Sequence, residues 1–266
     1  MRISIRQQLS VTPPPGTANA VLQLLLTPQS GRSQQIESWG VDMAGIAEAG
    51  HFTDAFGNET HLVNQTRPDG PLVVTIEGVV RTTDTHGVLG WPAREPVPAL
   101  YRRVTSLAKA PAGMPAKFRG GKNRLDTLHG LMGWVGEVLG TEQLKGQSQM
   151  AADGSQQQSQ GGGSRVLPPA GDYAHAFIGA CRAVDIPARY VTGYLAGAED
   201  GPTAFHAWAE AHDDRLGWIG FDPRLQLCPT DRHVRLAVGL DALGARPIRM
   251  VPAEEVTEID IRVEAA

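Results

Sequence analysis

The stretch that most restricts the fold runs from Arg165 to Pro223, where a helical pattern gives way to several short strands. Apolar residues spaced four apart, Tyr173, Phe177 and Cys181, predict a helix with one buried face. The helix should end before Pro187, because proline cannot continue a helix. Strands are predicted after it over Arg189–Ala196, Ala204–Ala211 and Gly217–Phe221.

Polar residues mark the ends of these elements. Asp172 lies in the first turn of the helix, where a negative charge suits the helix dipole. His206 lies on the second strand, and Asp222 follows the third. A site at the start of a helix, followed by strands that carry a histidine and then an aspartate, is the layout of a cysteine–histidine–aspartate hydrolase. No cysteine stands at the start of this helix, where the sequence reads Pro-Pro-Ala-Gly at 168–171.

The first 90 residues carry mainly strand patterns. Arg2–Val11 alternates polar and apolar residues, which is typical of a half-buried strand. Further strands are expected over Ala20–Thr27, Gln35–Met43, Thr60–Val63 and Leu72–Arg81. These strands predict an antiparallel, sandwich-like N-terminal domain over residues 1–90, separated by the proline-rich passage Pro92–Pro98 from a second domain over residues 91–266.

The second domain opens with helical spacing over Ala99–Lys109 and again over Asn123–Leu139. The low-complexity segment that follows is rich in Gln, Ser and Gly, so residues 145–164 are predicted to form a mobile loop. Strands are expected near the end of the chain over Val234–Val238 and Glu258–Val263. The polar cluster Asp231–His233 could border the site.

Taken in order, the motifs resemble the bacterial transglutaminase-like family of the papain-like thiol hydrolase superfamily. The matching runs are DYAH at 172–175, IPARYVTGYL at 186–195, HAW at 206–208 and GWIGFDP at 217–223, with DAFGN at 54–58 matching the preceding β-rich domain. The resemblance implies an α+β fold, a papain-like, transglutaminase-like domain behind a β-rich N-terminal domain. Its chemistry is that of a cysteine peptidase, an amide hydrolase or a transglutaminase.

The resemblance also implies roles for three positions. His206 matches the histidine that takes and returns the proton, and Asp222 matches the carboxylate that orients its imidazole. The nucleophilic cysteine of the family stands two residues before the Asp172 match, which is Ala170 here. A methyl group cannot attack a carbonyl, so whether the chain is an enzyme is left open.

The neighbours of Ala170 depart from the family as well. Active relatives usually have a glycine-rich approach to the cysteine and Gln or Arg after it, whereas this chain has Pro168-Pro169 before and Gly171 after. The residue after Asp-Pro is usually Thr, and here it is Arg224. Several departures together favour a naturally degenerate site over a single designed substitution.

Other residues offer weaker candidates. Cys181 lies about three helical turns, or ~16 Å, beyond Ala170 and cannot replace the nucleophile. Cys228 follows the Asp222 motif in an expected loop and could be recruited. Trp208 and Trp218 could line a substrate groove or pack in the core. A metal site built from His175, His206, His212 and Asp222 matches no established spacing, and no metal or cofactor is predicted.

Composition excludes some partners. The net charge is −4, and no cluster of Lys and Arg interleaved with aromatics occurs, so no nucleic-acid partner is expected. The apolar runs are too short to span a membrane, no membrane partner is predicted, and a cytoplasmic, bacterial protein is expected.

Three functions fit these observations. The favoured one is a pseudoenzyme that binds a peptide, a protein or an amide group without cleaving it. The alternatives are an active cysteine peptidase or amidase whose cysteine is replaced in this version of the sequence, and a scaffold or interaction protein.

Overall fold

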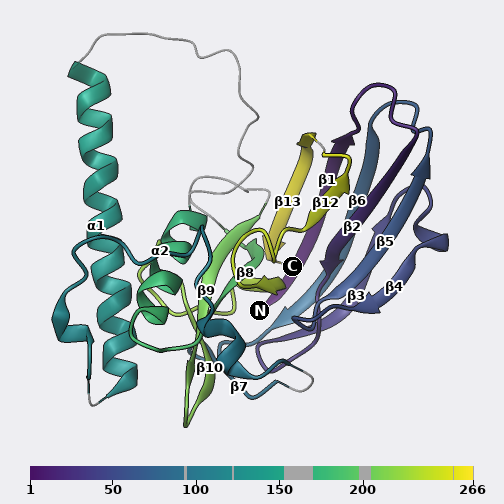
Figure 1. Ribbon diagram of the computed structural model, residues 1–266. Coiled ribbons are helices and arrows are strands. Elements are labelled where there is room, and N and C mark those ends of the chain that lie inside the picture. Colours follow the sequence, from purple (N-terminus) through teal and green to yellow (C-terminus); the bar gives the residue numbers. More distant parts are fainter. Residues whose placement is uncertain (93–94, 122, 153–169, 198–204, 254, 266) are drawn as a thin grey trace.

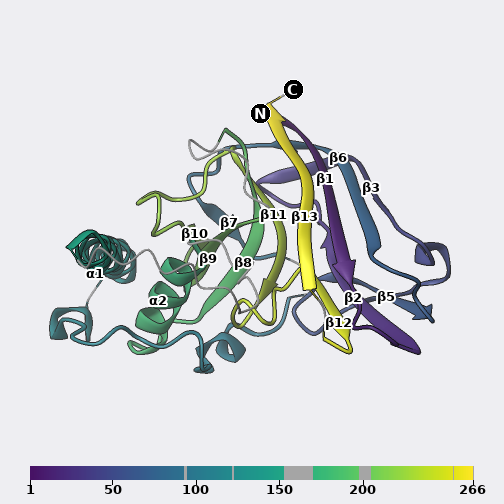
Figure 2. The same cartoon turned by 90° about the horizontal axis from the view of Figure 1, so that it is seen from above.

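The computed structural model describes residues 1–92, 95–121, 123–152, 170–197, 205–253 and 255–265. Figures 1 and 2 show the helices, a single sheet and a β-sandwich side by side as three layers. The single sheet has five strands. The sheets have the strand orders β13-β1-β6-β3, β12-β2-β5-β4 and β11-β8-β9-β10-β7. This architecture confirms the predicted α+β class, with a β-rich N-terminal region ahead of the helices and the five-stranded sheet.

The sandwich is built mainly from the first six strands. Their bounds are β1 (Arg2–Thr12), β2 (Asn19–Thr27), β3 (Gln34–Asp42), β4 (Gly50–Thr53), β5 (Glu59–Thr66) and β6 (Leu72–Thr82). The alternating pattern of β1 places Ile3, Ile5 and Leu9 in the core between the two sheets and buries Gln7 on the same face, while the alternate residues face outward or lie half-buried.

Two strands from the end of the chain complete the sandwich. β12 (Ile248–Val251) pairs antiparallel with β2, and β13 (Glu255–Ala265) pairs antiparallel with β1. The division predicted at residue 90/91 stays a prediction; it placed both segments in the second domain, and the structure pairs them with strands of the first 90 residues. An alternating pattern predicts a strand, but it does not reveal which strand will be its neighbour.

The five-stranded sheet joins the sandwich to the helices. Its strands are β7 (Val88–Gly90), β8 (Ala188–Leu195), β9 (His206–Asp213), β10 (Gly217–Phe221) and β11 (His233–Gly239). Ala188, Ala209 and Phe221 pack on the helix side, while Tyr194 and Val234 belong to the sandwich core. The sheet is covered on both faces, which explains why its central strands are buried almost throughout.

Within the described residues, the α-helices are α1 (Arg124–Ala152) and α2 (Ala170–Arg182), and the short 3-10 turns are η1 (Ile46–Glu48), η2 (Pro98–Arg102) and η3 (Ala116–Phe118). The helix predicted over residues 99–109 is wrong, because only η2 forms there. The chain beyond η2 runs instead against α2, where the backbone of Lys109 and Ala110 approaches Gly179. This tertiary contact sets the conformation of the segment after η2 and outweighs the weak helical spacing of its sequence.

α1 extends further than its sequence pattern suggested. The predicted loop at 145–164 is incorrect over residues 145–152, which continue the helix. Gln, Lys, Met and Ala in this segment are good helix formers, and low apolar content does not prevent a helix. The rest of the predicted loop lies outside the described residues. None of the helices in the described part of the chain is long and apolar enough to cross a membrane.

Candidate active site

The start of α2 holds the position that the sequence assigned to a nucleophile. Ala170 is the first residue of the helix and is fully buried, in the same apolar cluster as Ala207 and Tyr190. Tyr173 and Ala174 belong to the same cluster, so the first turn of the helix packs into the core. A helix N-terminus carries free backbone N–H groups and a partial positive charge, which would favour a thiolate. This chain places a methyl group there.

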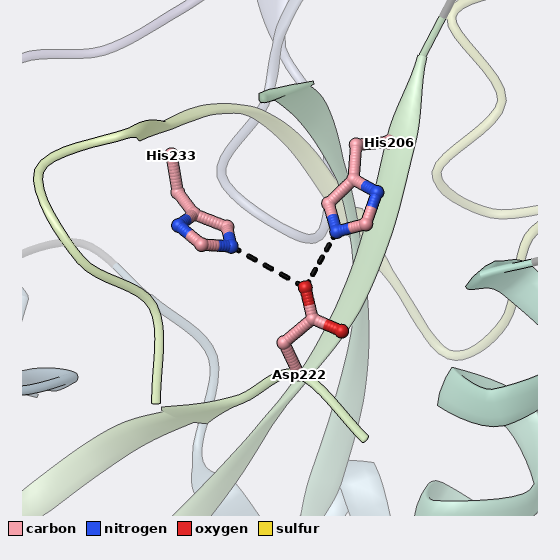
Figure 3. Close-up of side chains that lie close together, drawn as sticks. All are labelled: His206, Asp222 and His233. Carbon is pink, nitrogen blue, oxygen red and sulfur yellow. Dashed lines mark hydrogen bonds and ion pairs between the residues drawn. The ribbon is translucent and has the colours of Figure 1, made fainter. Parts of the chain in front are cut away.

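His206 and Asp222 lie close together on neighbouring strands of the five-stranded sheet. His206 is the first residue of β9, and Asp222 directly follows β10, the neighbouring strand. The Nε2 atom of His206 lies 2.5 Å from Oδ2 of Asp222, and both side chains are almost wholly buried. Figure 3 shows the other ring nitrogen, Nδ1, pointing away from the carboxylate. The structure therefore brings together two of the three predicted site residues as a buried dyad.

The turn after β10 fixes the direction of the Asp222 carboxylate. The backbone N–H groups of Arg224 and Leu225 each donate to Oδ1 at 3.1 Å. Leu227 closes the turn through paired backbone hydrogen bonds with Asp222. With Oδ1 held by the backbone, Oδ2 is the oxygen presented to His206.

A second histidine also reaches this oxygen. His233 is the first residue of β11, and its Nε2 atom lies 3.3 Å from Oδ2 of Asp222. Figure 3 shows the carboxylate oxygen between the two imidazole rings. The sequence pointed only to a polar cluster at 231–233 that could border the site. The available signal was a histidine at the start of a strand that is mainly apolar.

The charge state of Asp222 follows from these contacts. Burial acts to raise the pKa of its carboxyl group, but the hydrogen bonds from His206 and His233 outweigh burial and hold the pKa well below its ordinary value. Asp222 is therefore ionised and accepts hydrogens only, so Nε2 of His206 carries the proton that it donates. In the neutral imidazole, Nδ1 is then left with the lone pair and is the basic nitrogen.

The two tryptophans named as groove candidates are both buried. Trp208 stacks on His206, with ring centroids 6.0 Å apart, and meets His233 edge-on at 5.4 Å. Trp218 lies under the guanidinium of Arg189, with 3.9 Å between its ring centroid and the guanidinium carbon. Each is only 2% exposed, which favours the packing alternative. Their role as groove residues stays a prediction.

A buried ionic network went unrecognised in the sequence. Arg189 on β8 contacts Glu210 on β9 and Glu95 at 2.6 Å each, and Arg235 on β11 contacts Glu210 at 2.9 Å. Arg189 lies in the quoted motif IPARYVTGYL, and Glu210 lies on the strand predicted over Ala204–Ala211. The pairs link three adjacent strands to the segment after β7, so these residues serve the fold.

Neither cysteine is an activated thiol. Cys181 is fully buried in α2, and burial raises the pKa of its thiol well above the ordinary value. Burial also raises the pKa of the half-buried Cys228. A thiol with a raised pKa supplies little thiolate near neutral pH. Recruitment of Cys228 as a nucleophile is therefore disfavoured.

The same three polar residues could hold a metal ion by distance alone. Ligand atoms of His206, Asp222 and His233 lie within 4.8 Å of one another. However, the backbone N–H of Thr230 donates to Nδ1 of His233 at 3.2 Å, so this nitrogen has the lone pair and Nε2 has the proton. A protonated Nε2 cannot ligate a metal ion. Of the histidines weighed earlier, His175 instead accepts the backbone N–H of Ala242 through Nε2.

A cavity of about 480 Å³ lies between the sandwich and the five-stranded sheet. Its lining includes Gln34, Phe56, Trp91 and Arg235, and it does not include Ala170, His206 or Asp222. The cavity and the dyad are therefore separate features of the molecule.

Stability should fall as the pH drops from 7 toward 5. His175 and His233 each accept a backbone N–H and so must be neutral, and burial lowers the pKa of both. In the unfolded chain the same imidazoles take up a proton near their ordinary pKa of about 6.5. The unfolded state then binds more protons, and each group removes up to ~1.4 kcal/mol of stability per pH unit below that value.

Urea unfolding measured from pH 8 to pH 5 checks this. His175→Gln, whose amide oxygen can still accept the Ala242 N–H, should show a shallower decline than the parent chain. A free energy of unfolding that is constant or rises as the pH falls through 6 would contradict the assignment.

Comparison with known proteins places these features in a family. The "Transglutaminase-like superfamily" model matches residues 117–223, and the "Bacterial transglutaminase-like N-terminal region" model matches residues 3–81. An uncharacterized protein of Mycobacterium leprae is 32% identical over 100 residues, which cover 35% of this chain and 35% of that protein.

A solved structure has the same fold. The crystal structure of an inferred cysteine protease from Cytophaga hutchinsonii matches this chain with a TM-score of 0.65 and 19% sequence identity. The match covers 100% of this chain and 90% of the chain in that crystal structure. At that identity the likeness concerns the fold alone. The two family models confirm the family that the motifs resembled, and the solved structure confirms the fold.

Proposed function

Because the chain belongs to the transglutaminase-like superfamily, we propose that it is a pseudoenzyme that binds peptide or amide groups without cleaving them. The observation that carries the proposal is Ala170, a buried methyl group at the first position of α2. Covalent catalysis in this family needs a nucleophile at that position, and loss of the nucleophile typically removes most of the acceleration. The buried His206–Asp222 dyad is kept.

The residue after Ala170 supports natural loss of the nucleophile. A Cβ atom at Gly171 would lie 2.8 Å from the hydroxyl oxygen of the buried Tyr190, closer than real contacts allow. The Gln or Arg usual in active relatives would therefore need Tyr190 to move. Two adjacent positions, 170 and 171, are thus unlike a working site, which a single substitution made for study would not produce.

The dyad can still serve binding. Asp222 is a fixed anion, and Nδ1 of His206 has a lone pair that can accept a hydrogen from an amide N–H. An amide group that reached this nitrogen would be held without any atom present to attack it. We also propose that the protein works in the cytoplasm and has a peptide or protein ligand, with no nucleic-acid partner, in line with its net charge of −4.

The test compares the parent chain with its Ala170→Cys variant. The parent should hydrolyse neither peptide nor glutamine-amide substrates, and iodoacetamide should not label its residue 170. The variant should gain a thiol at residue 170 that is alkylated faster than an ordinary cysteine, because the helix N-terminus and His206 favour the thiolate. Peptide mapping by mass spectrometry separates residue 170 from Cys181 and Cys228.

Three outcomes distinguish the readings. Adding His206→Ala to the Ala170→Cys variant should slow alkylation of residue 170. Hydrolysis by the parent well above background and lost in His206→Ala would contradict the pseudoenzyme. Reaction by neither form, together with no binding of the peptide and amide substrates in calorimetry, would favour a scaffold protein.

A further inference from the structure

His233 has a single tautomer that the surrounding structure dictates. The backbone N–H of Thr230 donates to its Nδ1 atom, so the ring proton must be on Nε2. Nε2 in turn lies 3.3 Å from Oδ2 of Asp222. His233 therefore donates a hydrogen bond to the same oxygen that accepts one from His206.

Asp222 thereby receives a full set of donors. Its two oxygens accept from the backbone N–H groups of Arg224 and Leu225 and from the rings of His206 and His233. An ionised carboxylate offers about four lone-pair sites. Rotating the carboxylate, or protonating it, would break at least one of these bonds inside a buried region.

We infer that His233 is a positioning residue, which holds the Asp222 carboxylate in the one orientation that aligns the His206 ring with Nδ1 pointing away from it. Asp222 then acts as a fixed anion and does not accept a proton from His206. Trp208 packs against both imidazoles and excludes water from this arrangement. The inference depends on the proposed function in one respect: it takes His206 to be the residue that contacts the bound ligand.

The opposite reading, a metal ion held by His206, Asp222 and His233, requires a different proton position. Both Nε2 atoms would have to lose their protons, and His233 would have to carry its proton on Nδ1. The Thr230 N–H points at that nitrogen, so two donors would then face each other. The position of the ring proton therefore decides between the two readings.

The first experiment uses the parent chain labelled with ¹⁵N-histidine. Long-range ¹H–¹⁵N correlation spectra at pH 7.5 should show both His206 and His233 with the proton on Nε2, and adding Zn²⁺ should leave both sets of signals unchanged. A proton on Nδ1 of His233, or Zn²⁺-dependent shifts at both rings, would overturn the inference.

The second experiment measures the pH profile of iodoacetamide alkylation at residue 170 in the Ala170→Cys variant. Adding His233→Ala should slow alkylation about 10-fold near neutral pH, as expected when a hydrogen bond to a charged group is lost. His233→Gln, whose amide N–H can donate to Asp222, should restore much of the rate. His212→Ala is the matched control. It removes a buried histidine of β9, and the pH profile of alkylation should stay unchanged.

Results that contradict the positioning role of His233 differ from those that contradict the proposed function. If His233→Ala does not fold, His233→Leu keeps the volume and still removes the donor. Equal rates and profiles for the variants at 233 and at 212 would overturn the positioning role. An Ala170→Cys variant with an unreactive thiol would instead count against the proposed function, and the proton positions in the parent chain would still decide the role of His233.

Discussion

Replacing Asp222 with asparagine is expected to lower the free energy of unfolding by about 1–3 kcal/mol or more, the usual cost when a buried hydrogen-bond donor is left unsatisfied. The Asp222 side chain is fully buried and accepts from His206, His233 and two backbone N–H groups. The asparagine oxygen can still accept from the backbone. Its NH₂ group then faces two imidazole N–H donors, so buried donors are left unsatisfied.

Equilibrium unfolding in guanidinium chloride at pH 7.5 measures this loss. Asp214→Asn is the matched control: Asp214 pairs with Arg124 at 2.7 Å, but its side chain is 75% exposed, and exposed pairs contribute little. If the two variants lost similar amounts of stability, the proposed saturation of Asp222 by buried donors would be wrong.

Gly179→Ala should also be strongly destabilising, by roughly 1–3 kcal/mol or more, as is typical when atoms are forced into a packed interior. A Cβ atom at this position in α2 would lie 2.1 Å from the carbonyl carbon of Lys109 and 2.5 Å from the backbone nitrogen of Ala110. Both contacts are with backbone, which cannot rotate away as a side chain could. Either α2 or the segment after η2 would have to shift.

Gly133→Ala in α1 is the control for this effect. Apart from its chain neighbours and the backbone of its own helix, no atom of the described residues lies within 4 Å of a Cβ built at Gly133, so the higher helix propensity of alanine should raise the free energy of unfolding by up to ~1 kcal/mol. Thermal and chemical unfolding of both variants give the comparison. Stabilisation by Gly179→Ala would show that the close approach of residues 109–110 is not maintained in solution.

Local patterns in the sequence predicted most single elements of the fold. Alternation gave the strands β1 and β6 to within one residue, and helical spacing with Pro187 gave most of α2. Such local patterns could not predict which strands would pair with each other. Nothing local in the last segment, Glu255–Ala265, indicates that its neighbour is β1 at the opposite end of the chain.

The candidate site was predicted in part for the same reason. The order of the motifs was enough to single out His206 and Asp222, whose contact the structure then provides. His233 comes to Asp222 only because β11 pairs with β8, which adjoins β9. That neighbourhood is a property of the sheet order. The burial of Trp208 likewise depends on rings contributed by two different strands.

Two local predictions failed because tertiary contacts or intrinsic propensity outweighed the pattern used. The spacing of Leu100, Val104 and Leu107 suggested a helix, yet Val104 is 64% exposed and the chain there follows the surface of α2. At 145–152 low complexity suggested a loop, although the residue types favour a helix.

The return of β12 and β13 to the sandwich has a consequence for how the protein is made. The whole transglutaminase-like unit is inserted, in topological terms, between two parts of one sandwich. During synthesis, β1 and β2 leave the ribosome well before β12 and β13, so each keeps an unpaired edge until its partner emerges. The eleven residues of β13 therefore close an open sheet edge, and a nascent chain that stops short of them exposes a template for aggregation.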